Sequence, residues 1–196
     1  MADIKKLTDT LKARGFSVSS YATGQEAADY LDSQIDGCTV ASGGSMTLRD
    51  LGILPRLAAH NKIMTHRPGE ASVQEMTSEV YLCSVNGLAE TGEIINIDGT
   101  GNRVASTLFG HKRVYLVVGS NKIAPDYESA LRRARNIAAP KNAQRLHCST
   151  PCAVKGDRCY NCKGPNSICS ALVVLWNRPR GIDRMEIVLV DEDLGY

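Results

Sequence analysis

Hydrophobic and polar positions along the chain follow two periods, one typical of helices and one typical of strands. Ile4, Leu7 and Leu11 recur at helical spacing within residues 3–14, which predicts an amphipathic helix. The apolar and β-branched run at residues 16–21 then predicts a short strand. Because similar alternations continue to the end of the chain, the pattern predicts a succession of helices and strands.

Several of the later elements carry signals beyond their periodicity. A Thr-Gly-Gln-Glu capping box at residues 23–26 begins the second predicted helix. The run Val-Tyr-Leu-Val-Val at 114–118 is typical of a fully buried strand, and residues 126–138 show helical spacing. Two more helices are expected after Ser45 and over residues 102–109. The other predicted strands lie at residues 38–42, 62–66, 79–84, 94–97, 172–176 and 186–190.

This order of elements favours one α/β fold. Strands that alternate with helices predict a mostly parallel sheet with helices on both faces. A chain of 196 residues is long enough to bury a proper core, so residues 1–196 are expected to form a single domain. Residues 139–170 differ, because they are polar and hold five of the seven cysteines. We expect a cysteine-rich loop excursion at about 147–170.

Composition and charge exclude several classes of partner. The net charge of +2 creates no strong field toward nucleic acid, and an aromatic content of 5% offers few platforms for stacking bases. No apolar run is long enough to span a bilayer. The N-terminal segment carries acids and lacks the apolar core of a signal peptide. The chain is therefore expected to be cytoplasmic, with no nucleic-acid partner.

Three glycine-rich or polar loops follow predicted strands, at residues 42–47, 98–103 and 119–122. Glycine lets backbone N–H groups approach a phosphate or carboxylate, and ligands of open α/β sheets bind beyond the carboxyl ends of strands. Arg103 and Lys122 add candidate positive charges. The candidate ligand-binding residues in these loops are Gly43, Gly44, Ser45, Thr47, Asp98, Gly99, Thr100, Gly101, Asn102, Arg103, Asn121 and Lys122. Ordinary turns are the alternative, although three such loops together favour a crevice for a small anion.

The stretch from Ala89 to Ala105, which contains Asp-Gly-Thr-Gly-Asn-Arg at 98–103, resembles the LUD (lactate utilisation) domain family. Further matches are the Gly-Gly-Ser loop, Val117–Gly119 with the following Asn-Lys pair, and Thr150-Pro151-Cys152. The resemblance covers nearly the whole chain. It implies a fold similar to the superfamily of ribose-5-phosphate isomerase, glucosamine-6-phosphate deaminase and CoA transferases.

The same resemblance implies a role in the oxidation of L-lactate to pyruvate or in related organic-acid metabolism. Members of this family are associated with multi-protein, iron–sulfur-dependent systems, so other lactate-oxidation subunits are expected partners. The chain lacks the tandem ferredoxin-type cysteine runs of the larger subunit and is similar to a short, stand-alone member. No particular organic cofactor is implied.

A turn at Glu90, Thr91 and Gly92 faintly resembles the turn that supplies the glutamate nucleophile of CoA transferases, although the flanking residues differ. Glu90 is therefore a candidate nucleophile or base, and Thr91 and Gly92 are candidate ligand contacts. A solvated or hydrogen-bonded turn glutamate is the alternative interpretation.

Five cysteines lie close together in the sequence, and the last four have the spacing C-x6-C-x2-C-x6-C. Thiolates at this spacing can converge on one ion if the backbone forms a loop, as the intervening glycines and prolines favour. Zinc or a [4Fe–4S] cluster would take four such ligands. The candidate ligands are Cys152, Cys159, Cys162 and Cys169. Reduced structural thiols and a redox disulfide stay open as alternatives.

Three hypotheses about function follow. The first is a LUD-family protein that binds an anionic metabolite, or a nucleotide or CoA-like ligand, at the glycine-rich loops. The second is a CoA-transferase-like or phosphosugar-isomerase-like enzyme that uses Glu90. The third is a non-catalytic subunit whose cysteines hold structural zinc. The sequence leaves open whether the chain turns over a substrate by itself, and its apolar strands near the C-terminus favour a homodimer.

Overall fold

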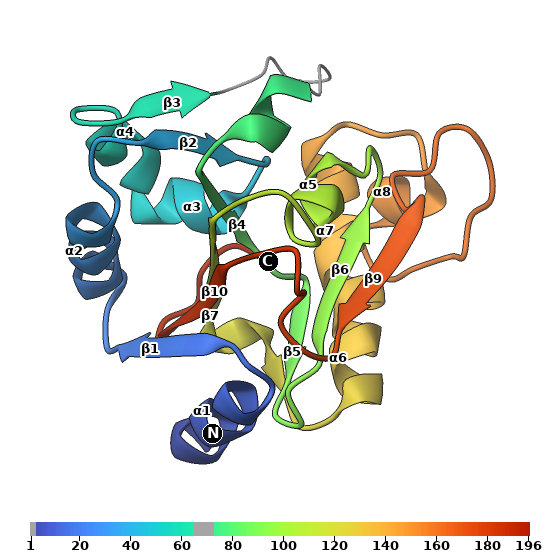
Figure 1. Ribbon diagram of the computed structural model, residues 1–196. Coiled ribbons are helices and arrows are strands. Elements are labelled where there is room, and N and C mark those ends of the chain that lie inside the picture. Colours follow the sequence, from blue (N-terminus) through green and yellow to red (C-terminus); the bar gives the residue numbers. More distant parts are fainter. Residues whose placement is uncertain (1–2, 65–72) are drawn as a thin grey trace.

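A six-stranded parallel sheet forms the centre of the computed structural model (Figure 1), which describes residues 3–64 and 73–196. All neighbouring strands pair in parallel. In spatial order the strands are β1 (Ser17–Tyr21), β10 (Arg184–Val190), β7 (Arg113–Gly119), β4 (Val80–Ser84), β2 (Thr39–Ser42) and β3 (Lys62–Met64). The prediction of a mostly parallel α/β fold is confirmed. The end of the predicted strand 62–66 lies outside the described residues.

Strand β7 shows why the sheet is buried on both faces. Val114, Leu116 and Val118 belong to one hydrophobic cluster, whereas Tyr115 and Val117 belong to another. Side chains of a strand alternate between the two faces of the sheet, so each face of β7 contributes to a separate core. This arrangement explains why the run at 114–118 is apolar at every position.

Helices cover one face of the large sheet. They are α2 (Gly24–Gln34), α3 (Met46–Leu51) and α4 (Ile53–Leu57), which pack their apolar side chains into one cluster. The predicted capping box at the start of α2 is present. The Thr23 hydroxyl accepts a hydrogen bond from the backbone N–H of Glu26, whose carboxylate accepts one from the backbone N–H of Thr23.

The other face of the large sheet is covered by α1 (Ile4–Ala13) together with a second, four-stranded sheet (Figure 1). This second sheet has the order β8 (Ile123–Ala124), β5 (Gly87–Ala89), β6 (Ile94–Asp98) and β9 (Ala171–Leu175). The sequence predicted helices on this face and did not predict a second sheet. Strands of two or three residues, such as β8 and β5, are too short to show a period of two.

A long helical segment lies behind the second sheet. It runs through α6 (Tyr127–Arg133), the π-helix η3 (Ala134–Ala138) and α7 (Ala139–Arg145). The predicted helix over 126–138 therefore continues further than expected. Pro140 does not end it. This proline stands in the first turn of α7, directly after the π-helix, where the regular α-helical hydrogen-bond pattern is already interrupted.

Shorter helices complete the fold. The 3-10 turns η1 (Val73–Thr77) and η2 (Ser120–Lys122) precede β4 and β8, and α5 (Asn102–Ser106) ends before the predicted limit at residue 109. The predicted loop excursion at about 147–170 contains a short helix, α8 (Pro151–Lys155), and is otherwise irregular. This segment connects α7 to β9.

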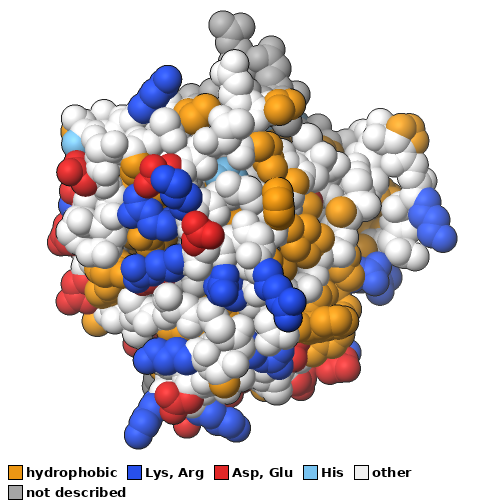
Figure 2. Space-filling model, viewed as in Figure 1, with side chains coloured by type: hydrophobic (Ala, Val, Ile, Leu, Met, Phe, Trp, Pro, Cys, Tyr) orange, Lys and Arg blue, Asp and Glu red, His pale blue; other side chains and the backbone are white. Residues whose placement is uncertain are grey.

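The outer surface of the second sheet carries exposed hydrophobic side chains. A band of them runs down the right half of the space-filling view, over the four-stranded sheet (Figure 2). Strand β9 is an edge strand, and Leu172 and Trp176 are 50% and 66% exposed. The homodimer stays a prediction that this edge favours. None of the described helices is long and apolar enough to cross a membrane.

Candidate functional site

A cavity of about 670 Å³ lies at the carboxyl ends of three neighbouring strands of the large sheet, where they meet the end of β6. The loop after β2 contributes Gly43–Thr47, β4 ends at Ser84, and η2 after β7 contributes Lys122. These residues are far apart in the sequence and meet because β2, β4 and β7 are adjacent and parallel. Volumes of this size suit small metabolites.

Most of the loop residues selected from the sequence line this cavity. Those in the lining are Gly43, Gly44, Ser45, Thr47, Asp98, Gly99, Thr100, Asn102, Arg103 and Lys122. Gly101 and Asn121 lie beside it without lining it. Asn121 instead holds the C-terminal segment, because its side chain accepts a hydrogen bond from Leu194 N and donates one to Gly195 O.

The loop after β2 approaches its neighbours closely. A Cβ atom added to Gly43 would lie 2.8 Å from the Tyr81 hydroxyl oxygen, whereas one added to Gly44 would meet nothing within 4 Å. Ser45 begins α3, and its hydroxyl accepts a hydrogen bond from the backbone N–H of Leu48. The glycine at position 43 is therefore required by close packing, and the Ser45 side chain has a capping role.

Lys122 is the most deeply buried cation of the lining, with 3% of its surface exposed. Its Nζ atom donates hydrogen bonds to Thr47 Oγ1 at 2.6 Å and to Ser84 Oγ at 2.8 Å. Among the described residues no carboxylate lies within ion-pair distance of this amine. Burial, followed by the positive charges of Arg133 and Arg103, lowers the pKa of Lys122 from 10.5 to about 7.

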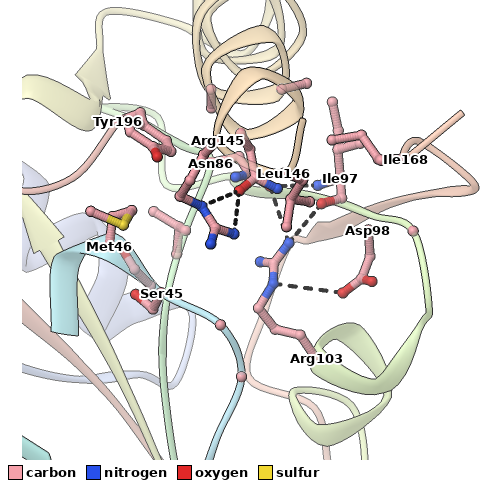
Figure 3. A pocket seen from close by; sticks show the side chains of 18 of the residues that line it. Ser45, Met46, Asn86, Ile97, Asp98, Arg103, Arg145, Leu146, Ile168 and Tyr196 are labelled. Carbon is pink, nitrogen blue, oxygen red and sulfur yellow. Dashed lines mark hydrogen bonds and ion pairs between the residues drawn. The ribbon is translucent and has the colours of Figure 1, made fainter. Parts of the chain in front are cut away.

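Arg103 and Asp98 organise the loop at residues 98–103. The Asp98 carboxylate accepts hydrogen bonds from the backbone N–H groups of Thr100, Gly101 and Val104. It also faces Arg103 Nε at 3.6 Å (Figure 3). Both groups are thus largely committed within the protein, and Asp98 has little capacity left to repel an anion.

The Arg103 guanidinium also anchors α5 to the second sheet. It donates hydrogen bonds to the side-chain oxygens of Asn96 and Asn86 and, at 2.6 Å, to the backbone carbonyl of Ile97. Asn96 is fully buried. Arg103 therefore has a structural role that the sequence did not predict beside its candidate role as an anion-binding charge.

We call Gly43–Thr47, Ser84 and Lys122 the inner wall of the cavity. The outer wall comes from α7 and the cysteine-containing segment and consists of Asn142, Arg145, Leu146 and Ile168. Arg145 and Arg103 enter the cavity from different elements, α7 and α5 (Figure 3). The Arg145 guanidinium donates to Asn142 Oδ1 at 2.8 Å and has no carboxylate partner among the described residues.

The sequence did not predict this outer wall. Asn142 and Arg145 have the i, i+3 spacing of neighbours on one helix face. This spacing places them together only if the helix continues beyond Pro140. Tyr196 also lines the cavity and was not predicted. Three basic side chains and one carboxylate, that of Asp98, now line the cavity, so its lining favours an anionic ligand.

The turn with the candidate nucleophile lies elsewhere. Glu90, Thr91 and Gly92 are not part of the cavity lining, because Asn86 occupies the cavity end of β5 and Glu90 follows its opposite end. The carbonyl of Thr91 accepts a hydrogen bond at 2.6 Å from Arg14, the residue that follows α1. The structure thus separates Glu90 from the glycine-rich loops with which the sequence grouped it.

Three of the four candidate metal ligands lie within electrostatic range of the fourth, Cys169. Burial raises the pKa of Cys169 to about 11, with further contributions from Cys159, Cys152 and Cys162. All are free thiols. Over the described parts of the chain, however, no three His, Cys, Asp or Glu side chains converge in a way that could hold a metal ion.

Hydrogen bonds show what the cysteines contact instead. The Cys159 sulfur accepts from Asn161 N at 3.3 Å, and the Cys162 thiol faces Ser167 Oγ at 3.9 Å. The thiols as arranged therefore do not fit a metal ion or cluster, and no chemical step is assigned to one.

Comparison with known proteins agrees with this architecture. The sequence model of the LUD domain matches residues 4–190, which is nearly the whole chain. The chain belongs to the LUD domain family. A search of curated protein sequences finds no match.

One solved structure supports the LUD fold independently. It is described as a DUF162 family protein from Deinococcus radiodurans, and it aligns with a TM-score of 0.58 over 95% of each chain. The two sequences are 14% identical, so the similarity concerns the fold alone.

Proposed function

We propose that this LUD-domain protein binds a small organic acid of the lactate–pyruvate class in the cavity between its two sheets, as part of lactate or related organic-acid metabolism. The observation that carries the proposal is the charge of the lining. Lys122 and Arg145 face the cavity without carboxylate partners among the described residues, while the Asp98 carboxylate is occupied by backbone N–H groups. Family membership supports the metabolic context.

A ligand screen tests this proposal directly. Thermal shift and calorimetry with L-lactate, pyruvate, CoA esters and sugar phosphates should show stabilisation by a small organic acid, since a ligand that binds only the folded state raises its stability. Arg145→Ala should reduce that stabilisation, and Arg180→Ala, at an exposed site outside the lining, should leave it unchanged. The absence of stabilisation by any of these anions would contradict the proposal. Preference for CoA esters would favour the nucleotide-like ligand.

The enzyme hypothesis based on Glu90 is kept as a second proposal with its own test. A transferase or isomerase that uses this carboxylate requires Glu90→Gln to abolish turnover while ligand binding persists. The position of Glu90 beyond the far end of β5 favours binding at the cavity over chemistry at this turn. Turnover by the Gln variant at the wild-type rate would remove Glu90 from the mechanism.

A zinc ion or iron–sulfur cluster at the four cysteines also stays a proposal, supported by their spacing in the sequence alone, and it requires the thiols to move closer together than the described arrangement has them. Metal analysis and a visible absorption spectrum of anaerobically purified protein would separate zinc from iron. A colourless, metal-free protein that binds its ligand fully would contradict both. The same preparation, analysed with candidate lactate-oxidation subunits, would test whether those subunits bind the chain.

A further inference from the structure

The hydrogen bonds around Lys122 define which form of the amine the cavity accommodates. Its two hydroxyl partners already use their own protons elsewhere. The Ser84 hydroxyl donates to the Val117 carbonyl at 2.6 Å, and the Thr47 hydroxyl donates to the Leu194 carbonyl at 3.2 Å. Both hydroxyl oxygens therefore present only lone pairs to Nζ, and each accepts one hydrogen from it.

The two hydroxyl acceptors, Thr47 and Ser84, match the number of N–H groups on a neutral Lys122 amine. A neutral lysine has two N–H groups and one lone pair, whereas the ammonium form has three N–H groups and a charge to compensate. No carboxylate among the described residues lies within ion-pair distance of this amine, and the more distant Asp50 favours its charge less than Arg133 and Arg103 oppose it. With both N–H groups bound to hydroxyls, the lone pair of a neutral Lys122 is free for an electrophile in the cavity.

We propose that Lys122 forms a Schiff base with the carbonyl carbon of a 2-oxo acid bound in the cavity. The inference rests on the proposed function, because it requires the acid group of the same ligand to bind there. It narrows the ligand from organic acids in general to those with a carbonyl next to the carboxylate. Arg145 on the outer wall is the unpaired charge that remains for this carboxylate when Lys122 is neutral.

The reaction is balanced without an oxidant or reductant. The lone pair of Nζ forms a bond to the carbonyl carbon, and the carbonyl π electrons move to oxygen. The two protons that the nitrogen carries pass to this oxygen, which leaves as water while the C=N bond forms. A lysine that is desolvated and close to other cations is activated for this attack, because its unprotonated form is present near neutral pH.

Reductive trapping tests the proposal. The protein is incubated at pH 7.5 with pyruvate and sodium cyanoborohydride, and intact-mass and peptide mass spectrometry locate the reduced adduct. The adduct should form at Lys122 at least about tenfold faster than at any surface lysine, since a low pKa provides more free amine. Lys122→Met should abolish it. Lys112→Met, which removes an exposed lysine outside the cavity, should leave it unchanged.

L-Lactate separates failure of this inference from failure of the proposed function. Lactate has the carboxylate but no carbonyl, so it should compete with pyruvate without being trapped. If lactate and pyruvate both stabilise the protein but no adduct forms at Lys122, the Schiff base is wrong and acid binding stands. Labelling spread equally over surface lysines would also overturn the inference.

If neither acid stabilises the protein and pyruvate is not trapped, both proposals fail. Peptide mapping uses the wild-type chain, so the test holds even if Lys122→Met does not fold.

Discussion

The two walls of the cavity differ in how firmly their polar groups are held. On the inner wall, Thr47, Ser84 and Lys122 are buried at the end of β4 or in the first helical turn after β2 and β7, and hydrogen bonds fix each of them. On the outer wall, Arg145 and Leu146 are exposed at the end of a helix. Rigid, desolvated groups suit chemistry, whereas exposed groups suit adjustable contacts with a ligand. The difference indicates that reactivity belongs to the sheet and that ligand selection belongs to α7.

The largest expected effect concerns the buried charge of the inner wall. The pKa of Lys122 is lowered in the folded protein, so the unfolded chain binds more protons between about pH 7 and pH 10.5. Wild-type stability therefore gains a contribution of up to a few kcal/mol from this group as the pH rises through that range. Lys122→Met should lose this contribution.

Urea unfolding of the wild-type protein and of Lys122→Met at several pH values measures this pH-dependent contribution to stability. The stability of the Met variant relative to wild type should be highest at pH 6 and should fall toward pH 10. A difference that does not change with pH would show that Lys122 titrates normally.

The next largest effect distinguishes a structural role of Arg103, through its hydrogen bonds, from a role as a free positive charge for the ligand. Arg103→Ala should destabilise the protein by about 2–4 kcal/mol, because it leaves the buried Asn96 and the Ile97 carbonyl without their donor. Chemical denaturation measures this loss. A variant with unchanged stability and reduced anion binding would assign Arg103 to the ligand instead.

Two neighbouring glycines give a matched comparison within the inner wall. Gly43→Ala should cost about 1–3 kcal/mol, because the added methyl group would lie against the buried Tyr81 hydroxyl. Gly44→Ala should change stability by less than about 0.5 kcal/mol, since its Cβ meets nothing within 4 Å. Thermal unfolding of the pair measures the difference. Equal destabilisation by both substitutions would contradict the close approach at Gly43.

The smallest effect on stability is expected on the outer wall. Arg145→Ala should change the free energy of unfolding by less than about 0.5 kcal/mol, because the side chain is exposed and its partner Asn142 is a near neighbour on the same helix. Binding of pyruvate or lactate should weaken by about 3- to 10-fold, as for loss of one exposed charge contact. Calorimetry gives the affinity. A large loss of stability without a change in affinity would reverse the roles of the two walls.

Long periodic segments and capping signals were predictable from the sequence. The capping box at Thr23 and the doubly buried strand at 114–118 depend on local chemistry, and both occur where the sequence places them. The convergence of Gly43 and Lys122 was also predictable, because the carboxyl ends of adjacent parallel strands share one edge of a sheet.

Features that depend on tertiary packing were not predictable. Strand β5 has three residues, so the sequence could not show its direction, and Glu90 was grouped with loops at the other end of the strand. The second sheet packs against the apolar face of the large sheet, a long-range contact that local sequence patterns do not show. Likewise, Pro140 is normally a stop signal, and only packing shows that a new helical turn begins there and carries Arg145 to the cavity.

The π-helix η3 has a consequence for how this cavity tolerates changes in chain length. A π-helical turn contains about one residue more than an α-helical turn, and both complete one full rotation. Deleting a single residue from Ala134–Ala138 should therefore restore a regular α-helical turn and leave α7 in about the same rotation, with Arg145 still at the cavity. A one-residue change in length can be absorbed in this segment, while the outer wall, the sheet and its buried lysine stay in place.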